Sequence, residues 1–137
     1  MHTRLPAAIV VVLAMTSGCR GTVNATSGAP IPQTAQLNVS FPPPPLFIRL
    51  PHFGFYVGVG TFYDIVYVHD NYYLYYGETW YRAPNFKGPW TAVPSEVLPP
   101  VIRKQRIESI RKDRDMEYRL YRRDKTHYRG RIFRPDR

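Results

Sequence analysis

Residues 62–83 read FYDIVYVHDNYYLYYGETWYRA, and they carry the clearest fold signal in the chain. Tyrosine, valine, isoleucine and tryptophan dominate this stretch, and all four residue types favour β-strands. Turn residues interrupt it twice, at 69–71 (HDN) and at 77–78 (GE). The pattern predicts strands over 62–68, 72–76 and 79–83, joined by tight turns.

Weaker strand signals flank this stretch. Residues 55–60 (FYVGVG) precede it, and residues 90–93 (WTAV) follow a loop that begins and ends with proline. We therefore expect a small antiparallel β-meander of roughly three to five strands. This meander forms an aromatic β module over residues 51–100.

The two faces of this module do not differ clearly in polarity. Alternation places Tyr63, Ile65 and Tyr67 on one face, while Asp64 shares the other face with two valines. One face should pack in the core, which leaves the other to contact a protein or a glycan. The candidate aromatic contacts are Tyr73, Tyr75, Trp80 and Trp90. Alternatively, tyrosines on an exposed face only pair with one another across strands.

The positive charge is concentrated after the module. From Arg103 to Arg137 there are 14 Lys and Arg against six Asp and Glu, whereas the whole chain has a formal charge of +9. Residues 102–125 contain no glycine or proline, which predicts a helix within a basic tail over 101–137. Its apolar stripe is narrow and is interrupted by Arg114, so the helix should bury little. Residues 131–135 are expected to be extended and to fold back on the sheet. The predicted fold class is α+β.

The guanidinium groups of arginine bind phosphate, and the tyrosine rings that lie between the arginines of the tail stack on bases or sugars. The tail is therefore a candidate polyanion-binding surface. The candidate contacts are Arg111, Arg114, Arg119, Arg122 and Arg123. Alternatively, the tail is a solvated helix whose charges are balanced by its own acidic residues.

The N-terminus has the pattern of an export signal. Basic residues precede an apolar run over 5–15, which is too short to span a bilayer, and small residues lead into Cys19, the only cysteine. This end resembles the lipobox of bacterial lipoproteins, in which the cysteine carries the lipid, including palmitate. The resemblance implies a signal peptide over 1–18, lipidation at Cys19 and, because Arg20 follows, sorting to the outer membrane. The alternative is a periplasmic or secreted protein with a free thiol.

Residues 19–50 are rich in Pro, Ser and Thr and include four consecutive prolines at 42–45. Such a composition predicts an extended, largely unpacked and disordered N-terminal linker.

No pattern of catalytic, metal-binding or cofactor-binding residues is found. The histidines are isolated, so no zinc spacing exists, and Asp64 among apolar residues suits a hydrogen-bonding role better than catalysis. We therefore expect a non-enzymatic protein without a metal or cofactor.

Residues 53–134 as a whole resemble a group of uncharacterised envelope lipoproteins of Gram-negative bacteria. The resemblance lies in the tyrosine-rich strands, the Trp-Tyr-Arg element at 80–82, the Gly-Pro-Trp element at 88–90 and the basic tail. The resemblance supports an envelope location and this architecture, but it implies no catalytic residue or ligand. From the aromatic sheet we expect a lipid-anchored outer-membrane module that contacts an envelope protein or glycan. The alternative function is binding of a polyanion by the tail: lipopolysaccharide, an anionic wall polymer or extracellular nucleic acid. Genomic nucleic acid is not an expected partner, and the sequence predicts no oligomeric state.

Overall fold

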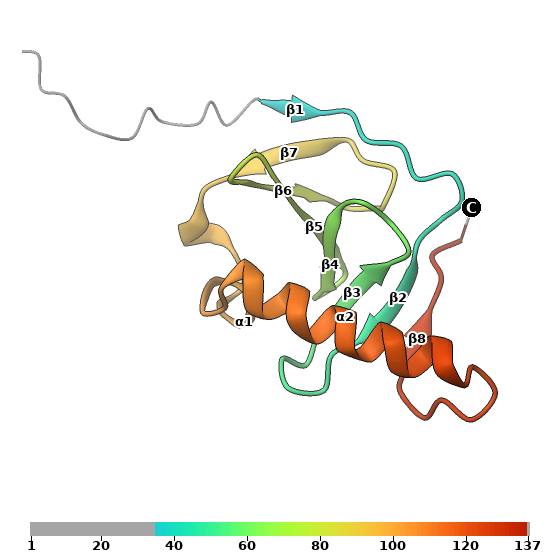
Figure 1. Cartoon of the computed structure of the whole chain (residues 1–137). Coiled ribbons are helices and arrows are strands. Elements are labelled where there is room, and N and C mark those ends of the chain that lie inside the picture. Colours follow the sequence, from blue (N-terminus) through green and yellow to red (C-terminus); the bar gives the residue numbers. More distant parts are fainter. Residues whose placement is uncertain (1–34, 137) are drawn as a thin grey trace, which may run out of the picture.

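The computed structural model describes residues 35–136 (Figure 1). The predictions for the signal peptide, for Cys19 and for the first part of the linker lie outside these residues. In chain order the elements are β1 (Gln36–Leu37), β2 (Leu46–Arg49), β3 (Tyr56–Val59), β4 (Asp64–Val68), β5 (Asn71–Tyr76), β6 (Thr79–Ala83), β7 (Trp90–Val93), the 3-10 turn η1 (Ser95–Val97), α1 (Pro100–Arg103), α2 (Ile107–Arg123) and β8 (Ile132–Phe133). The predicted α+β class is confirmed.

The strands of residues 35–136 form one sheet, in the order β1-β7-β6-β5-β4-β3-β2-β8, and every neighbouring pair is antiparallel. Its centre is the predicted meander. The turn His69-Asp70 has φ angles of 49° and 59°, and the turn Gly77-Glu78 has φ angles of 55° and 62°. Positive φ at both turn residues is the type I′ geometry, whose twist matches that of the strands it joins. The eight-stranded sheet is larger than the small meander that was predicted.

The sheet curls strongly toward one of its faces. Phe47 on β2 and Tyr72 on β5 have ring centroids only 5.5 Å apart, although β3 and β4 lie between their strands. In a flat sheet these strands would be about 14 Å apart, at roughly 4.8 Å per step. The curl thus encloses an inner cluster, which consists of Phe47, Ile65, Tyr72, Leu74, Ala83, Phe86 and Trp90.

Gly58 on β3 allows the neighbouring strand to approach at this point. A Cβ on Gly58 would overlap the Cγ2 atom of Ile65 on β4. Glycine in a strand interior often marks such a close approach.

The connection from β1 to β2 crosses from one side of the sheet to the other, because β1 pairs with β7 and β2 lies near the opposite edge. Phe41 in this crossing packs its ring 6.3 Å from that of Trp90 and 5.3 Å from that of Tyr63. Phe47 and Ile48, which follow the crossing, are fully buried. The prediction of an unpacked linker as far as residue 50 is therefore wrong from residue 35 onward, since large apolar residues at 41 and 46–50 join the core.

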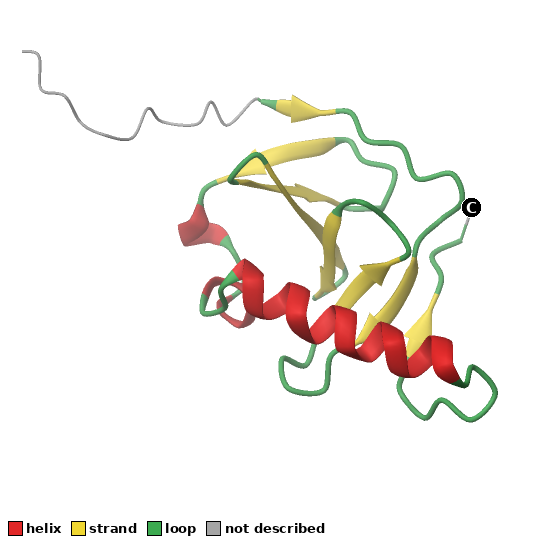
Figure 2. Cartoon of the chain, viewed as in Figure 1, coloured by secondary structure: helices red, strands yellow, loops and turns green. Residues whose placement is uncertain are grey.

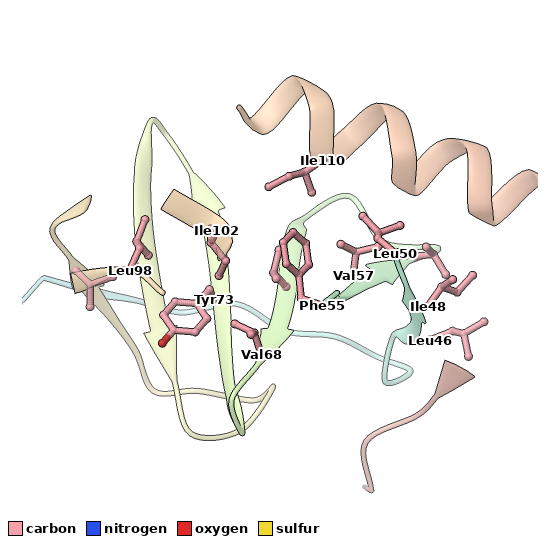
Figure 3. Packing of buried hydrophobic residues seen from close by; sticks show 13 residues of the cluster. Leu46, Ile48, Leu50, Phe55, Val57, Val68, Tyr73, Leu98, Ile102 and Ile110 are labelled. Atoms are coloured by element: carbon pink, nitrogen blue, oxygen red, sulfur yellow. The ribbon is translucent and has the colours of Figure 1, made fainter. Parts of the chain in front are cut away.

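The helices cover the other face of the sheet (Figure 2). Ile102 of α1 and Ile110 of α2 are buried in a helix-side cluster with residues of the strands, among them Val57, Val68 and Tyr73 (Figure 3). The predicted continuous helix over 102–125 is interrupted between Arg103 and Ile107. Helix α2 packs on the sheet through Ile110, its one buried residue, so it buries little, as predicted.

The predicted return of the C-terminal segment to the sheet is confirmed. Phe133 of β8 is paired with Phe47 of β2, and their rings stack with centroids 4.9 Å apart. Arg134 then donates from Nη1 to the Pro44 carbonyl at 3.0 Å, next to the crossing.

Asp64, at the start of β4, ties α2 to the sheet. Arg111 donates to its Oδ2 from Nε at 3.0 Å and from Nη2 at 2.7 Å, and Arg114 donates to Oδ1 from Nη1 at 2.6 Å. Only 14% of the Asp64 side chain is exposed. The hydrogen bonding of its guanidinium group to the Asp64 carboxylate raises the pKa of Arg111. The aspartate thus has the predicted hydrogen-bonding role. Arg114, which interrupts the apolar stripe of the helix, faces the sheet because it donates to this carboxylate.

Replacement of Gly58 by Ala is expected to lower the free energy of unfolding by about 1–3 kcal/mol, because the new methyl group overpacks the contact between β3 and β4. Urea unfolding measures the loss. The double variant Gly58→Ala/Ile65→Ala should lose less than the sum of the two single variants, since Ile65→Ala removes the overlapping atom. Strict additivity of the two losses would contradict this account.

The substitution Asp64→Ala is expected to cost about 1–3 kcal/mol of stability, because it leaves two arginines facing the sheet without their acceptor. Glu108→Ala provides the control: its pair with Arg106 spans 3.7 Å between side chains that are 65% and 85% exposed, and its loss should cost less than about 0.5 kcal/mol. Equal losses in urea unfolding would show that Asp64 does not hold the helix.

Candidate functional site

The four candidate aromatic contacts divide into two pairs. Tyr73 is buried in the helix-side cluster, and Trp90 is fully buried in the inner cluster, so neither side chain is open to a ligand. Tyr75 and Trp80 are half-buried neighbours whose ring centroids lie 5.1 Å apart. The prediction of a shared contact surface is therefore wrong for Tyr73 and Trp90, because both faces of the sheet are covered.

The five candidate arginines are also divided. Arg111 and Arg114 form ion pairs with Asp64, so their charge is largely compensated within the fold. Arg119 and Arg123 are exposed on α2. Arg122 lies with its guanidinium carbon 5.7 Å from the centroid of the Tyr118 ring, a cation–π distance.

Arg122 lines a groove that the sequence did not predict. This basic groove has a volume of about 460 Å³ and lies between the C-terminal half of α2, the crossing and the loop from β3 to β4. Its chemically distinctive residues are Tyr118, Tyr121, Arg122, Lys125 and Arg134, with the proline run 42–45 and Phe62 at its sides. No Asp or Glu is among its lining residues, so a negative charge placed in it meets only cations at close range.

The two tyrosines of the groove are held by their surroundings. The Tyr118 and Tyr121 rings are nearly parallel with centroids 6.3 Å apart, and Tyr128 abuts Tyr121 edge-on at 5.5 Å. Tyr128 in turn donates its hydroxyl proton to Glu117 Oε2 at 2.8 Å. Burial and this hydrogen bond raise the pKa of Tyr128 well above its usual value. Tyr128, in the chain after α2, therefore packs against Tyr121 and holds its ring in the wall of the groove.

The cations are also positioned. Lys125 lies with Nζ 5.9 Å from the Tyr121 ring centroid, and Arg134 is fixed by its bond to the Pro44 carbonyl. Lys125 and Arg134 were not among the predicted contacts, because nothing in the local sequence brings residues 42–45, 125 and 134 together. Only the pairing of β8 with β2 does so.

Phe62 is the most exposed large apolar residue, and its ring is fully accessible. It lies before β4, in the loop that follows Gly60, and not within a strand as predicted. A second groove, of about 540 Å³, begins on the far side of Phe62. This aromatic groove is lined by Phe62, Tyr63, Tyr75, Tyr76, Glu78, Glu108 and Arg111, among others.

No group of three or more His, Cys, Asp or Glu that would hold a metal ion occurs within residues 35–136. Two histidines there have single carboxylate partners: His52 lies 3.2 Å from Asp113, and His127 lies 2.9 Å from Asp124. Both histidines are exposed. The side chains that line the two grooves are aromatic rings, cations and a few carboxylates.

No family model, curated protein or solved structure matches the chain. The structure defines a class by its fold alone: a curled antiparallel sheet covered by a basic helix, with two grooves along the helix. Over residues 35–136 no helix is both long and apolar enough to cross a membrane.

Raising the pH above about 10 is expected to remove the contribution of Tyr128 to stability. A pKa raised by folding means that the stabilisation is fully present below the unfolded value of about 10 and is lost as the pH rises through the folded value. Tyr128→Phe should cost about 1 kcal/mol near neutral pH. The difference between wild type and this variant should then shrink in strongly alkaline solution.

Urea unfolding across this pH range tests the expectation. The exposed residue Tyr76 offers a control, since the difference between Tyr76→Phe and wild type should stay small at every pH. A stability difference for Tyr128→Phe that does not change with pH would contradict the role assigned to its hydroxyl group.

Proposed function

We propose that the protein is a non-enzymatic binding module that holds an anionic polymer of the cell envelope in the basic groove. The observation that carries this proposal is the composition of the groove: Arg122, Lys125 and Arg134 surround two tyrosines, and no carboxylate lines it. Charge-assisted hydrogen bonds from guanidinium groups to phosphate or carboxylate are among the strongest that a protein surface can offer.

The groove favours a bound anion in a second way, because its cations are held in place before binding. The bond of Arg134 to Pro44 and the contacts of Arg122 and Lys125 with tyrosine rings limit their movement. Side chains that are already ordered lose less entropy when a ligand arrives. The exposed arginines Arg119 and Arg123 add attraction at longer range, which speeds encounter more than it adds affinity.

The location in the envelope rests on the sequence. Cys19, the small residues before it and the resemblance to envelope lipoproteins support a protein anchored by lipid to the outer membrane, with the described fold presented on the linker. The nearest polyanions there are the phosphates of lipopolysaccharide and anionic wall polymers. Both are polymeric and fit an open groove better than a closed pocket.

An aromatic contact with an envelope protein is the second candidate function. Tyr75 and Trp80 remain the residues to carry it, since Tyr73 and Trp90 are buried. The pair is half-buried, whereas the basic groove brings three cations and two tyrosines together, and polyanion binding is therefore the function that the geometry favours.

The triple variant Arg122→Gln/Lys125→Gln/Arg134→Gln is expected to bind inorganic polyphosphate at least tenfold more weakly than wild type at low salt. It should also show a shallower dependence on salt, because fewer counterions are exchanged, by roughly 0.7 in slope for each lost contact. Titration calorimetry of the full chain at several salt concentrations measures both quantities.

A matched control has the same change in net charge outside the groove. Lys104, Lys112 and Arg129 are exposed and do not line it, so replacing these three by Gln should leave most of the affinity. If both triple variants lose affinity equally, binding is a general effect of charge and the groove is not the site. Circular dichroism confirms that each variant is folded.

A further inference from the structure

Phe62 is held outward by an ordered loop. Gly60 turns the chain with a φ of 70°, and the Tyr63 N–H donates to the Thr61 hydroxyl at 3.2 Å, so the ring between them is fixed toward solvent. A fully exposed phenylalanine forgoes the stabilisation that burial of its ring would bring. Such a residue in an ordered loop is typical of a contact point for a ligand.

The basic groove and the aromatic groove meet at this residue. Phe62 and Tyr63 line both of them, so a chain-like ligand that leaves one groove over Phe62 enters the other. Each groove has a volume within the range usual for small-ligand sites, about 300–1,000 Å³. Together they form a continuous surface along α2.

The two grooves differ in charge. The basic groove offers only cations as charged groups. The aromatic groove contains Glu78 and Glu108, and the one cation that lines it, Arg111, is paired with Asp64. Ionised carboxylates accept hydrogen bonds and do not donate them, so they suit hydroxyl groups and repel anions. A ligand with anionic groups along its whole length, such as polyphosphate, fits the first groove and is repelled by the second.

We infer that the ligand is an acidic glycan that binds across both grooves, with a carboxylate or phosphate group in the basic groove, a sugar ring stacked on Phe62 and neutral sugars in the aromatic groove. This inference rests on the proposed function and names the class of polymer. A sugar has an apolar C–H face that packs on aromatic rings and hydroxyl groups that donate to carboxylates. Tyr76, whose ring lies 6.4 Å from that of Tyr63, provides a second stacking surface beyond Phe62.

The test compares two soluble probes on the full chain. One is inorganic polyphosphate, which has charge but no rings; the other is a series of oligosaccharides of alternating glucuronate and N-acetylglucosamine. Phe62→Ser should weaken binding of the longer oligosaccharides about tenfold, the scale of one lost stacking contact, and should weaken polyphosphate binding much less, because polyphosphate has no ring to stack on Phe62. Phe62→Tyr, which keeps the ring, should remain within about twofold of wild type.

Two further variants sharpen the result. Glu78→Gln/Glu108→Gln should bind polyphosphate more tightly, because it removes the repulsion in the aromatic groove, and should bind the oligosaccharides more weakly. Leu120→Ser changes an exposed apolar residue that lines neither groove and should alter neither affinity.

The outcomes separate this inference from the proposed function. Binding of both probes with no effect of Phe62→Ser on the oligosaccharides overturns the glycan assignment and leaves polyanion binding in place. An equal loss for both probes in Phe62→Ser also overturns it, since the ring would then act through the basic groove alone. Failure of both probes to bind wild type overturns the inference and the proposed function together.

Discussion

The arrangement of the molecule depends on the carboxylate of Asp64. It stands at the start of β4 and receives hydrogen bonds from Arg111 and Arg114, which come from successive turns of α2. Apolar contacts alone would let a helix slide or rotate on a sheet, because they have no direction. Three charge-assisted hydrogen bonds to one carboxylate fix both the position and the rotation of the helix. Both grooves have α2 as one wall and the loop before β4 as another, so this contact sets their width.

The central strands and their turns were predictable because their signals are local. The type I′ turns at His69-Asp70 and Gly77-Glu78 lie between runs of β-forming residues, and each signal can be read within a few positions. The partners of β1, β2 and β8 were not predictable in this way. Their pairings join residues far apart in the chain, and the composition of residues 35–50 was dominated by its prolines. The outer strands of the sheet therefore depend on contacts between residues far apart in the sequence, which a local pattern does not reveal.

The candidate site was only partly predictable, for a related reason. Alternation normally separates a buried face from an exposed one, but both faces of this sheet are apolar because one packs inside the curl and the other under the helices. The pattern therefore did not show that Tyr73 and Trp90 are buried. Arg122 was among the predicted polyanion contacts and lines the groove, whereas Lys125 and Arg134 join it only through the fold. The exposure of Phe62 had one local signal, the glycine at position 60 that ends the preceding strand.

The basic residues of the tail fall into two groups, and the net charge of the tail does not distinguish them. Arg111 and Arg114 hold the helix on the sheet, and Asp124 accepts hydrogen bonds from the backbone at Thr126 and His127 just beyond α2. These groups shape the fold. Arg122, Lys125 and Arg134, by contrast, line one groove that no carboxylate lines. A count of basic residues would assign binding to the whole tail. We propose that binding is confined to the groove where the helix, the proline-rich crossing and the last strand meet, and a site confined in this way would distinguish one anionic polymer from another.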